Sequence, residues 1–275
     1  MSAAADQKPV GAMVAKAPPS ALSIRMANFP LAIPSVIGLI VFWQLVITIF
    51  GVPEYIAPSP AAVSRVFVDQ GWLLLRNFWP TLFEALAGFT SGNLTAILVA
   101  VIFVHNSLAE RAFYPLFVVL HTIPIIAIAP ILVLLFGNGY APKIMIAALI
   151  SFFPMLVNMV RGLRAVKPET MELMRILSAT KSEVFWNVRL QSSLPFLFSA
   201  LKISSTTCVI GALVGEWIGS NFGLGALIIE ATYNFRSPLL YATVIVGAAL
   251  ALSLFGIASL LERRVIRWNA GSVVG

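Results

Sequence analysis

Residues Pro168–Pro195 read PETMELMRILSATKSEVFWNVRLQSSLP and lie between two long apolar runs. This insert carries three of the chain's eighteen Lys and Arg residues and three of its eleven Asp and Glu residues. Its pattern predicts two short amphipathic helices with a break near Ser178–Lys181, too small to fold alone. Connections within helical bundles usually have about 2–8 residues. A longer polar insert therefore indicates a surface that docks onto another protein.

The composition of the whole chain excludes a soluble globular domain. Hydrophobic residues make up 59% of the chain and charged residues only 11%, against roughly 25% charged residues in soluble domains. The mean hydropathy is +0.94. Crossing the hydrocarbon core takes about 20 apolar residues, and six windows approach that length. They predict an all-α, polytopic membrane protein with about six transmembrane helices, at 31–51, 85–106, 113–136, 144–160, 196–217 and 239–261.

The distribution of positive charge predicts the orientation in the membrane. The net charge of +7 could suggest a nucleic-acid partner, but the basic residues follow the loops instead. With both termini inside, thirteen Lys and Arg fall on inner segments, four on outer segments, and Lys202 lies within a span. Cytoplasmic loops carry such an excess. We therefore expect a multi-pass protein of the bacterial plasma (inner) membrane, in contact with lipid and not nucleic acid, with cytoplasmic N- and C-termini.

Three divisions of the chain are expected. Residues 1–27 are predicted to be a disordered cytoplasmic tail, 28–268 the transmembrane domain with a cytoplasmic loop at 165–195, and 269–275 a C-terminal tail. Ser59-Pro60 has the pattern of a helix start, and predicts a helix through Leu75 along the outer face. No internal repeat is evident, which weighs against a carrier built from two inverted halves.

Prolines within the predicted spans indicate bends. Pro124 and Pro130 fall in the third span and Pro154 in the fourth. Proline removes a backbone donor and bends a spanning helix. Such a bend suits a path that opens and closes, and a static packing kink explains each of them equally well.

Four ionisable residues fall in or beside the spans, where charge is costly. Glu84 and Lys202 are expected to snorkel toward the interfaces. His121 fits a buried core position better than a solute contact. Glu216, followed by Trp217, is the best candidate for a translocation path, and an anchor at the outer interface is an equal alternative.

No catalytic set, metal site or cofactor site is evident in the sequence. One cysteine, Cys208, cannot form an internal disulfide, and only two histidines are present. Gly223-Leu224-Gly225 lacks the strand and the Lys-Ser/Thr of a phosphate-binding loop, and instead predicts a turn before a short outer helix at 226–233. The chain is therefore expected to be no enzyme.

The polar insert resembles the EAA loop of binding-protein-dependent ABC transporter permeases. The family spacing is kept from Glu172 to Ser178 and onward to Val188, and Leu194-Pro195 keeps a Leu-Pro pair. Leu173 and Met174 stand where the family has two alanines, Ser178 stands for the glycine, and Gln191 for the first proline. The resemblance implies that the ATPase-coupling residues are Glu172, Leu173, Met174, Ser178, Val188, Leu190 and Pro195.

The resemblance extends from about Trp43 to Trp268. IAPSPAAV, IPIIAIAP, FFPMLVNMVRGLR and GEWIGSNFGLGALI are similar to the sulfonate, taurine and nitrate branch, and to permeases for thiamine-precursor pyrimidines or riboflavin. The likeness implies a MetI-like fold, a homodimer, a cytoplasmic ABC ATPase dimer that hydrolyses the ATP, and a periplasmic or lipid-anchored solute-binding protein. The expected cargo is a small polar solute: a pyrimidine precursor or riboflavin first, then a sulfonate, taurine or nitrate.

The translocation path is expected to follow the dimer axis. Hydroxyl and carboxylate groups of the third and fifth spans mark it, at Thr122, Pro124, Ser204, Ser205, Glu216 and Trp217. The alternative function is a self-sufficient secondary carrier or channel, with an intramembrane enzyme a distant third. For the loop itself, the alternative is a helix pair that rests on lipid headgroups. Dependence on an ATPase partner separates these classes.

Overall fold

The computed structural model describes residues 21–266, and the side chains of residues 33–266. Most of the predicted N-terminal tail and all of the C-terminal tail lie outside the described residues; residues 21–27 already belong to the first helix. The described chain is helical: α1(Ala21–Phe50), α2(Pro60–Asp69), α3(Gly71–His105), α4(Ser107–Thr122), α5(Ile125–Phe136), α6(Tyr140–Arg164), α7(Pro168–Ile176), α8(Lys181–Val184), the π-helical turn η1(Phe185–Arg189), α9(Leu190–Glu216), α10(Leu224–Tyr233) and α11(Ser237–Val265).

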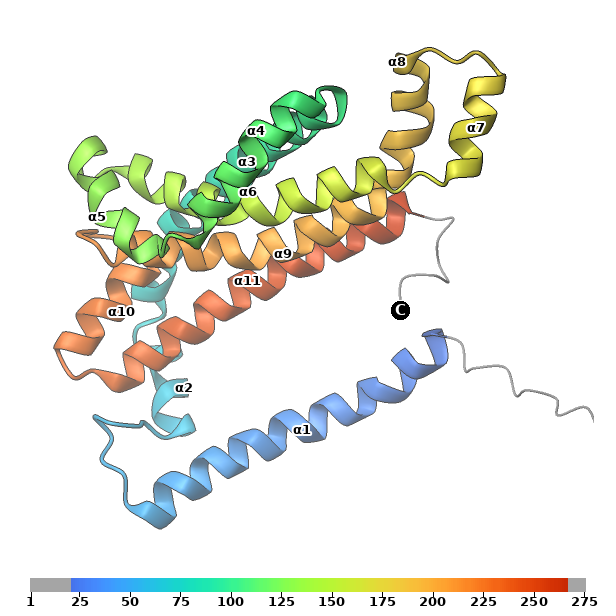
Figure 1. Ribbon diagram of the computed structural model, residues 1–275. Helices are drawn as coiled ribbons and strands as arrows, with labels where there is room; N and C mark the ends of the chain where they lie inside the picture. The colour runs from blue at the N-terminus through green and yellow to red at the C-terminus, as the bar shows by residue number, and fades with distance from the viewer. Residues whose placement is uncertain (1–20, 267–275) are drawn as a thin grey trace, which may run out of the picture.

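The predicted spans are confirmed as helices, the third of them as a bent pair of helices. Within residues 21–266, five helices are long and apolar enough to cross a membrane, and a sixth span arises if α4 and α5 count together. These two helices meet at 97°, so the third span expected at 113–136 is interrupted at the predicted bend beside Pro124 (Figure 1). Ile123 is extended, with ψ 124°, because the ring of Pro124 disfavours helical dihedrals in the residue before it. The predicted bend is thus a full break between two helices.

The second span begins earlier than the sequence indicated. Ser59 caps α2 by accepting a hydrogen bond from the Ala62 amide at 3.1 Å, and Pro60 opens the helix, as expected. The same helix was predicted to run to Leu75, but it ends at Asp69, and Trp72–Leu75 belong to α3. Asn77, Thr81 and Glu84, which follow in α3, are buried against neighbouring helices, so the span does not have to start at the apolar run.

Helices α3, α6 and α9 form the centre of the bundle through small residues. An added Cβ on Gly211 of α9 would lie 2.7 Å from the Cα of Ala147 on α6. Gly88 and Gly92 of α3 approach Ala147 and Ala148 in the same way. Small residues let spanning helices approach closely and gain van der Waals contact. These contacts fix the relative positions of the three helices.

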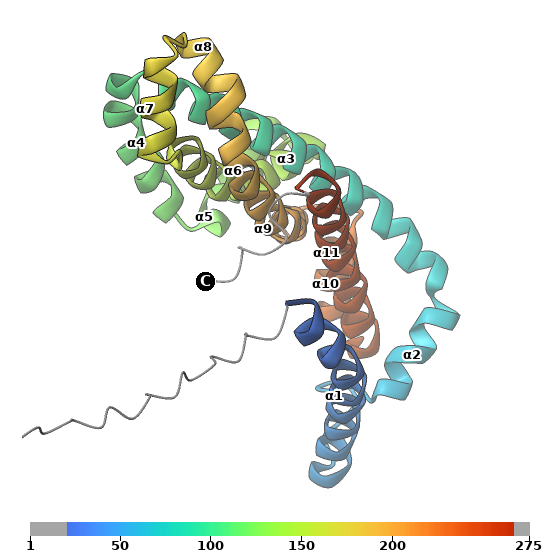
Figure 2. The ribbon, with the colours of Figure 1, turned by 90° about the vertical axis from the view of Figure 1, so that its right-hand side faces the viewer.

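The remaining helices cover parts of this centre. Helix α11 runs along α9, and α10 packs on α11 (Figures 1 and 2). Helix α1 meets α11 where Trp43 stacks on Tyr241, with ring centroids 5.7 Å apart, and no residue of 33–50 is fully buried. Two ends of the bundle can be distinguished in Figure 1: the α7–α8 end and the α10 end. The short helix predicted at 226–233 is confirmed as α10.

Candidate functional site

The helix pair at the α7–α8 end contains the predicted loop. Pro168 opens α7 with Glu169 in its first turn, and α7 ends at Ile176. Thr180 caps α8 in a reciprocal arrangement: its hydroxyl accepts from the Glu183 amide at 3.3 Å, and the Glu183 carboxylate accepts from the Thr180 amide at 2.7 Å. The predicted break between two short helices is confirmed. Local capping gives the loop a defined shape.

Ser178 has φ +53°, in the left-handed region. The Ser178 and Ala179 amides donate to the carbonyl oxygens of Arg175 and Met174, at 2.9 and 3.0 Å. Glycine adopts this conformation without steric cost, whereas a residue with a Cβ is strained there. The position where the EAA pattern has glycine is therefore the position that turns the chain.

Substitutions at Ser178 should change the local stability of the turn. Ser178→Val places a β-branched side chain at a left-handed position, where such a residue is a genuine outlier, so trypsin should cleave at Arg175 and Lys181 faster than in the natural chain. Ser178→Gly should slow the same cleavage. The matched control is Ser182→Val, at an exposed helical position of α8. Equal cleavage rates for the valine and glycine variants at Ser178 would contradict the strained turn.

The loop exposes a row of apolar side chains. Leu173 and Ile176 of α7 are 54% and 75% exposed, and Leu177, which caps the end of α7, is 65% exposed. Trp186, on η1, is 61% exposed. Of these residues the sequence predicted Leu173 but did not single out Ile176 or Trp186. The spacing of residues 173, 176 and 177 is that of one helix face and could have revealed Ile176. Of the other residues predicted for this loop, Glu172 is exposed and Met174 is half-buried.

The second arm of the loop continues directly into a span. Helix α8, η1 and α9 follow one another with no intervening loop, so the fifth span begins before the predicted residue 196. Phe185 is buried against the His105 ring, with centroids 5.0 Å apart. Val188, Leu190 and Pro195 are half-buried along this stretch. The exposed turn is therefore joined to α9 by continuous helix.

At the α10 end, a network of buried polar side chains joins α3 to the connection between α9 and α10. The Thr81 hydroxyl lies 2.6 Å from Glu216 Oε1, and the Gly225 amide donates to Glu216 Oε2 at 2.6 Å. Asn77 Oδ1 accepts from the Gly223 amide at 2.9 Å. A Cβ at Gly223 would collide with the Glu216 carboxylate. Glu216 therefore holds the end of α9 against α10 and α3 in this conformation.

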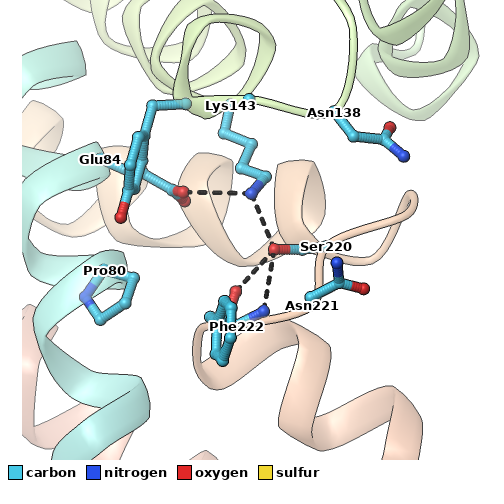
Figure 3. Close-up of a pocket in the computed structure, with 9 residues that line it drawn as sticks. Pro80, Glu84, Asn138, Lys143, Ser220, Asn221 and Phe222 are labelled. Atoms are coloured by element: carbon cyan, nitrogen blue, oxygen red, sulfur yellow. Dashed lines mark hydrogen bonds and ion pairs between the residues drawn. The ribbon is translucent and has the colours of Figure 1, made fainter.

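Glu84 and Lys143 form an ion pair beside this network. Lys143 Nζ lies 3.4 Å from Glu84 Oε1 and donates to Ser220 Oγ at 2.7 Å (Figure 3). Both side chains are buried, so the expectation that Glu84 snorkels at the interface is wrong. Lys143 was counted among the basic residues of the outer segments, but because it is buried it adds no exposed positive charge there. The reason is tertiary: α6 brings an ammonium group to a carboxylate on α3.

Lys202 is likewise paired, but 24% of its side-chain surface stays exposed, and its snorkelling toward the interface remains a prediction. Its Nζ lies 2.8 Å from the Glu262 carboxylate on α11. The pair joins α9 to α11 near the α7–α8 end. His121 is exposed and stacks on Phe153, with centroids 3.9 Å apart; the prediction of a buried core histidine is therefore wrong.

The predicted path residues fall into two groups. Thr122, Pro124 and Trp217 are exposed, the first two at the break between α4 and α5. Ser204 and Ser205 are buried, and the Ser204 hydroxyl donates to the Ser151 carbonyl oxygen of α6 at 3.1 Å. Glu216 is buried in the network described above. The structure does not bring the six side chains together into one cavity of the described chain.

The bundle with an exposed helix pair at one end is that of a multi-pass membrane protein. Its fold is similar to a chain of the inward-facing MetNI methionine ABC transporter, with a TM-score of 0.64 and 20% identity over 71% of this chain and 97% of that one. Residues 92–267 match the family "Binding-protein-dependent transport system inner membrane component". The chain belongs to this family and is the permease subunit of an ABC importer.

Curated relatives match over most of their length. The riboflavin transport system permease protein RibX of Chloroflexus aurantiacus is 34% identical over 261 residues, covering 94% of this chain and 97% of its own. The formylaminopyrimidine transport permease protein ThiX of Halalkalibacterium halodurans is 33% identical over 232 residues, covering 84% and 92%. The resemblance drawn from the EAA loop is thereby confirmed at the level of the family.

Proposed function

We propose that two copies of this chain form the translocation path of an importer, and that the α7–α8 pair couples the path to a cytoplasmic ABC ATPase dimer. ATP hydrolysis then takes place in the partner subunits and not in this chain. The observation that carries the proposal is the exposed apolar face of Leu173, Ile176 and Leu177, held on a capped turn that continues into α9. An apolar helix face presented at the surface is what helix-in-groove docking requires.

In this proposal the coupling residues provide the docking surface and set the geometry of the loop. Glu172 and Leu173 offer charge and apolar area to the ATPase groove, and Ser178 sets the angle between the two arms. Val188, Leu190 and Pro195 lie on the arm that is continuous with α9. Closure of the ATPase dimer would push the turn and tilt α9 with the helices packed on it, a hinge-type transition.

Uncovered apolar surface supports a second copy as partner. Helix α4 has no buried side chain, and α5 leaves Ile126, Ile131 and Leu134 exposed. Part of this surface meets lipid, and part would meet the partner permease. Thr122 and Pro124 lie on this uncovered side, where they would line a path between two copies. Ser204, Ser205, Glu216 and Trp217 remain predicted path residues that need a rearranged state to reach it.

The positive-inside distribution supports an orientation with both termini and the α7–α8 end in the cytoplasm. The α10 end then faces outward, where a periplasmic or lipid-anchored solute-binding protein would dock. The proposed cargo is a small polar, ring-bearing solute. Relatives named for riboflavin and formylaminopyrimidine transport support a pyrimidine precursor or riboflavin ahead of a sulfonate, taurine or nitrate.

Uptake should depend on the partner ATPase. Vesicles that hold the assembled importer should lose uptake to background when the Walker-motif lysine of the ATPase is replaced by Ala, since no other energy source acts on the permease. The solute is first chosen by a thermal-shift screen of the cognate binding protein with aminopyrimidines, riboflavin, taurine and nitrate. Uptake that persists with the inactive ATPase would favour a self-sufficient secondary carrier instead.

A further inference from the structure

A cavity opens at the α7–α8 end, between the loop and the junction of α3 with α4. It has a volume of about 400 Å³, within the range of about 300–1,000 Å³ that is usual for ligand pockets. In Figures 1 and 2 this junction lies beside the α7–α8 pair. The polar side chains that line the cavity are His105, Ser107, Lys181 and Arg189. The cavity is therefore separate from the polar network at the α10 end.

The charge of this lining is positive and uncompensated. Among the described residues that line the cavity there is no Asp or Glu. Within residues 33–266, the Lys181 and Arg189 side chains have no ion-pair or hydrogen-bond partner. The acid nearest to Lys181 along the chain is Glu183, whose carboxylate accepts from the Thr180 amide and hydroxyl, at 2.7 and 2.8 Å. Two cations are thus left for a ligand, which has to be an anion.

Arg189 is the residue that most needs such a partner. It lies on η1 and is half-buried, and a charge that loses hydration is costly without a partner. Its planar guanidinium group can donate two parallel hydrogen bonds to a phosphate, and Lys181 adds a point charge. Ser107 adds a hydroxyl group at the start of α4, where the helix dipole favours an anion. These donors suit a phosphate group.

The other half of the lining is apolar. Val104, Met171, Val184 and Phe185 supply it. Val104 lies in the last turn of α3, where the apolar window predicted at 85–106 ends. The cavity therefore lies where a span leaves the hydrocarbon core. A soluble phosphate would use only the cationic half of the lining, whereas a phospholipid carries its phosphate next to apolar glycerol and acyl groups.

The cavity stays open when the proposed ATPase contact forms. Met171 lines the cavity from α7, and Leu173 lies two residues further on, about 200° around the helix. On the second arm, Lys181, Phe185 and Arg189 recur every four residues and share the face that lines the cavity. The exposed apolar surface at Leu173 thus faces away from the cavity, and an ATPase docked on it leaves the cavity free.

We propose that this cavity binds the phosphate group of an acidic phospholipid in the cytoplasmic leaflet. Arg189 and Lys181 hold the phosphate, the Ser107 hydroxyl donates to it, and Val104 and Phe185 pack against the glycerol and the first acyl carbons. The choice of leaflet rests on the proposed orientation of the importer. The bound lipid joins the α3–α4 junction to the loop, so the composition of the membrane acts on the loop at this point.

The test measures lipid retention by the assembled importer with native mass spectrometry, after purification in detergent and titration with phosphatidylglycerol. This lipid should be retained saturably, and phosphatidylcholine, whose choline cancels the charge, much less. A basic residue near an anionic lipid contributes about fivefold in affinity, so Lys181→Gln with Arg189→Gln should weaken retention roughly 25-fold. The matched control, Lys167→Gln with Arg175→Gln, removes the same charge from exposed positions of the loop outside the cavity and should leave retention unchanged.

A second variant tests the site without removing a cation. Ser107→Glu places a carboxylate in the first turn of α4, where an acid is compatible with the helix, so the Tm should stay that of the natural chain. The new carboxylate repels a phosphate and offers Lys181 and Arg189 a partner within the chain. Retention of phosphatidylglycerol should therefore fall about fivefold or more.

Each contrary outcome overturns a distinct part of the proposal. The site falls if phosphatidylglycerol is not retained saturably, or if neither the glutamine pair nor Ser107→Glu weakens its retention. Equal retention of phosphatidylcholine would overturn the selection for an acidic lipid. Displacement by inorganic phosphate at millimolar concentration would overturn the lipid as the source of the phosphate. None of these measurements involves transport, so their failure leaves the importer standing, and ATPase-independent uptake would overturn the importer alone.

Discussion

Leu173→Asp should abolish ATP-driven uptake while the permease still inserts in the membrane. Leu173 is 54% exposed on the apolar face of α7, and docking on the ATPase would bury it. An unpaired carboxylate in such an interface costs several kcal/mol, and about 3 kcal/mol corresponds to a roughly 100-fold loss of association. The measurement is uptake into vesicles together with co-purification of the ATPase subunits.

The matched control for this variant is Asn187→Asp. Asn187 is exposed on η1, and the substitution adds the same charge to the loop without removing an apolar side chain. It should retain uptake and co-purification. If Leu173→Asp transports as well as this control, the loop is a helix pair that rests on lipid headgroups.

Glu216→Ala should strongly destabilise the permease. The substitution leaves the Thr81 hydroxyl and the Gly225 amide without the acceptor that each now has at 2.6 Å, and it removes a carboxylate beside Lys143. Breaking a buried charged contact costs about 3–5 kcal/mol. For a domain of this size, that lowers the Tm by roughly 6–20 °C. The measurement is the thermal midpoint of the purified permease, followed by the loss of its monodisperse peak in detergent.

Two further variants show whether the loss of stability comes from the hydrogen bonds of Glu216. Glu230→Ala removes a carboxylate from an exposed position of α10 and should leave the Tm unchanged. Glu216→Gln keeps an acceptor for Thr81 and should fall between the two. A thermally normal Glu216→Ala variant that fails to transport would contradict the structural role and restore Glu216 as a path residue.

Several features of the fold could be predicted from the sequence because they depend on local order along the chain. Apolar windows gave the positions of α6, α9 and α11, although Lys202 and Glu216 interrupt the window of α9, since the requirement to satisfy backbone groups in lipid leaves helices as the solution. Ser59-Pro60 marked the start of α2, and the Glu172–Ser178 spacing marked the break after α7. Each signal lies within a few residues of the structure it specifies.

Boundaries and bends were predicted less well, because they depend on neighbours in space. Asn77 and Thr81 are polar, so α3 was expected to begin after them; their bonds to Gly223 and Leu224 bury them inside the helix. Pro124 indicated a bend, but the 97° between α4 and α5 depends on where α5 packs against α6.

The sequence by itself determined that this chain spans a membrane several times, presents a helix pair at one end, and belongs to the ABC importer permeases, because hydropathy and motif spacing are properties of consecutive residues. Only the tertiary structure decided the roles of the buried charges. Glu84, Lys143 and Glu216 lie on three different helices, and Lys202 and Glu262 are sixty residues apart. Whether such a charge snorkels, lines a path or forms an ion pair depends on which group the packing of the helices places beside it, since a charge in a low-dielectric interior is stable only with a partner.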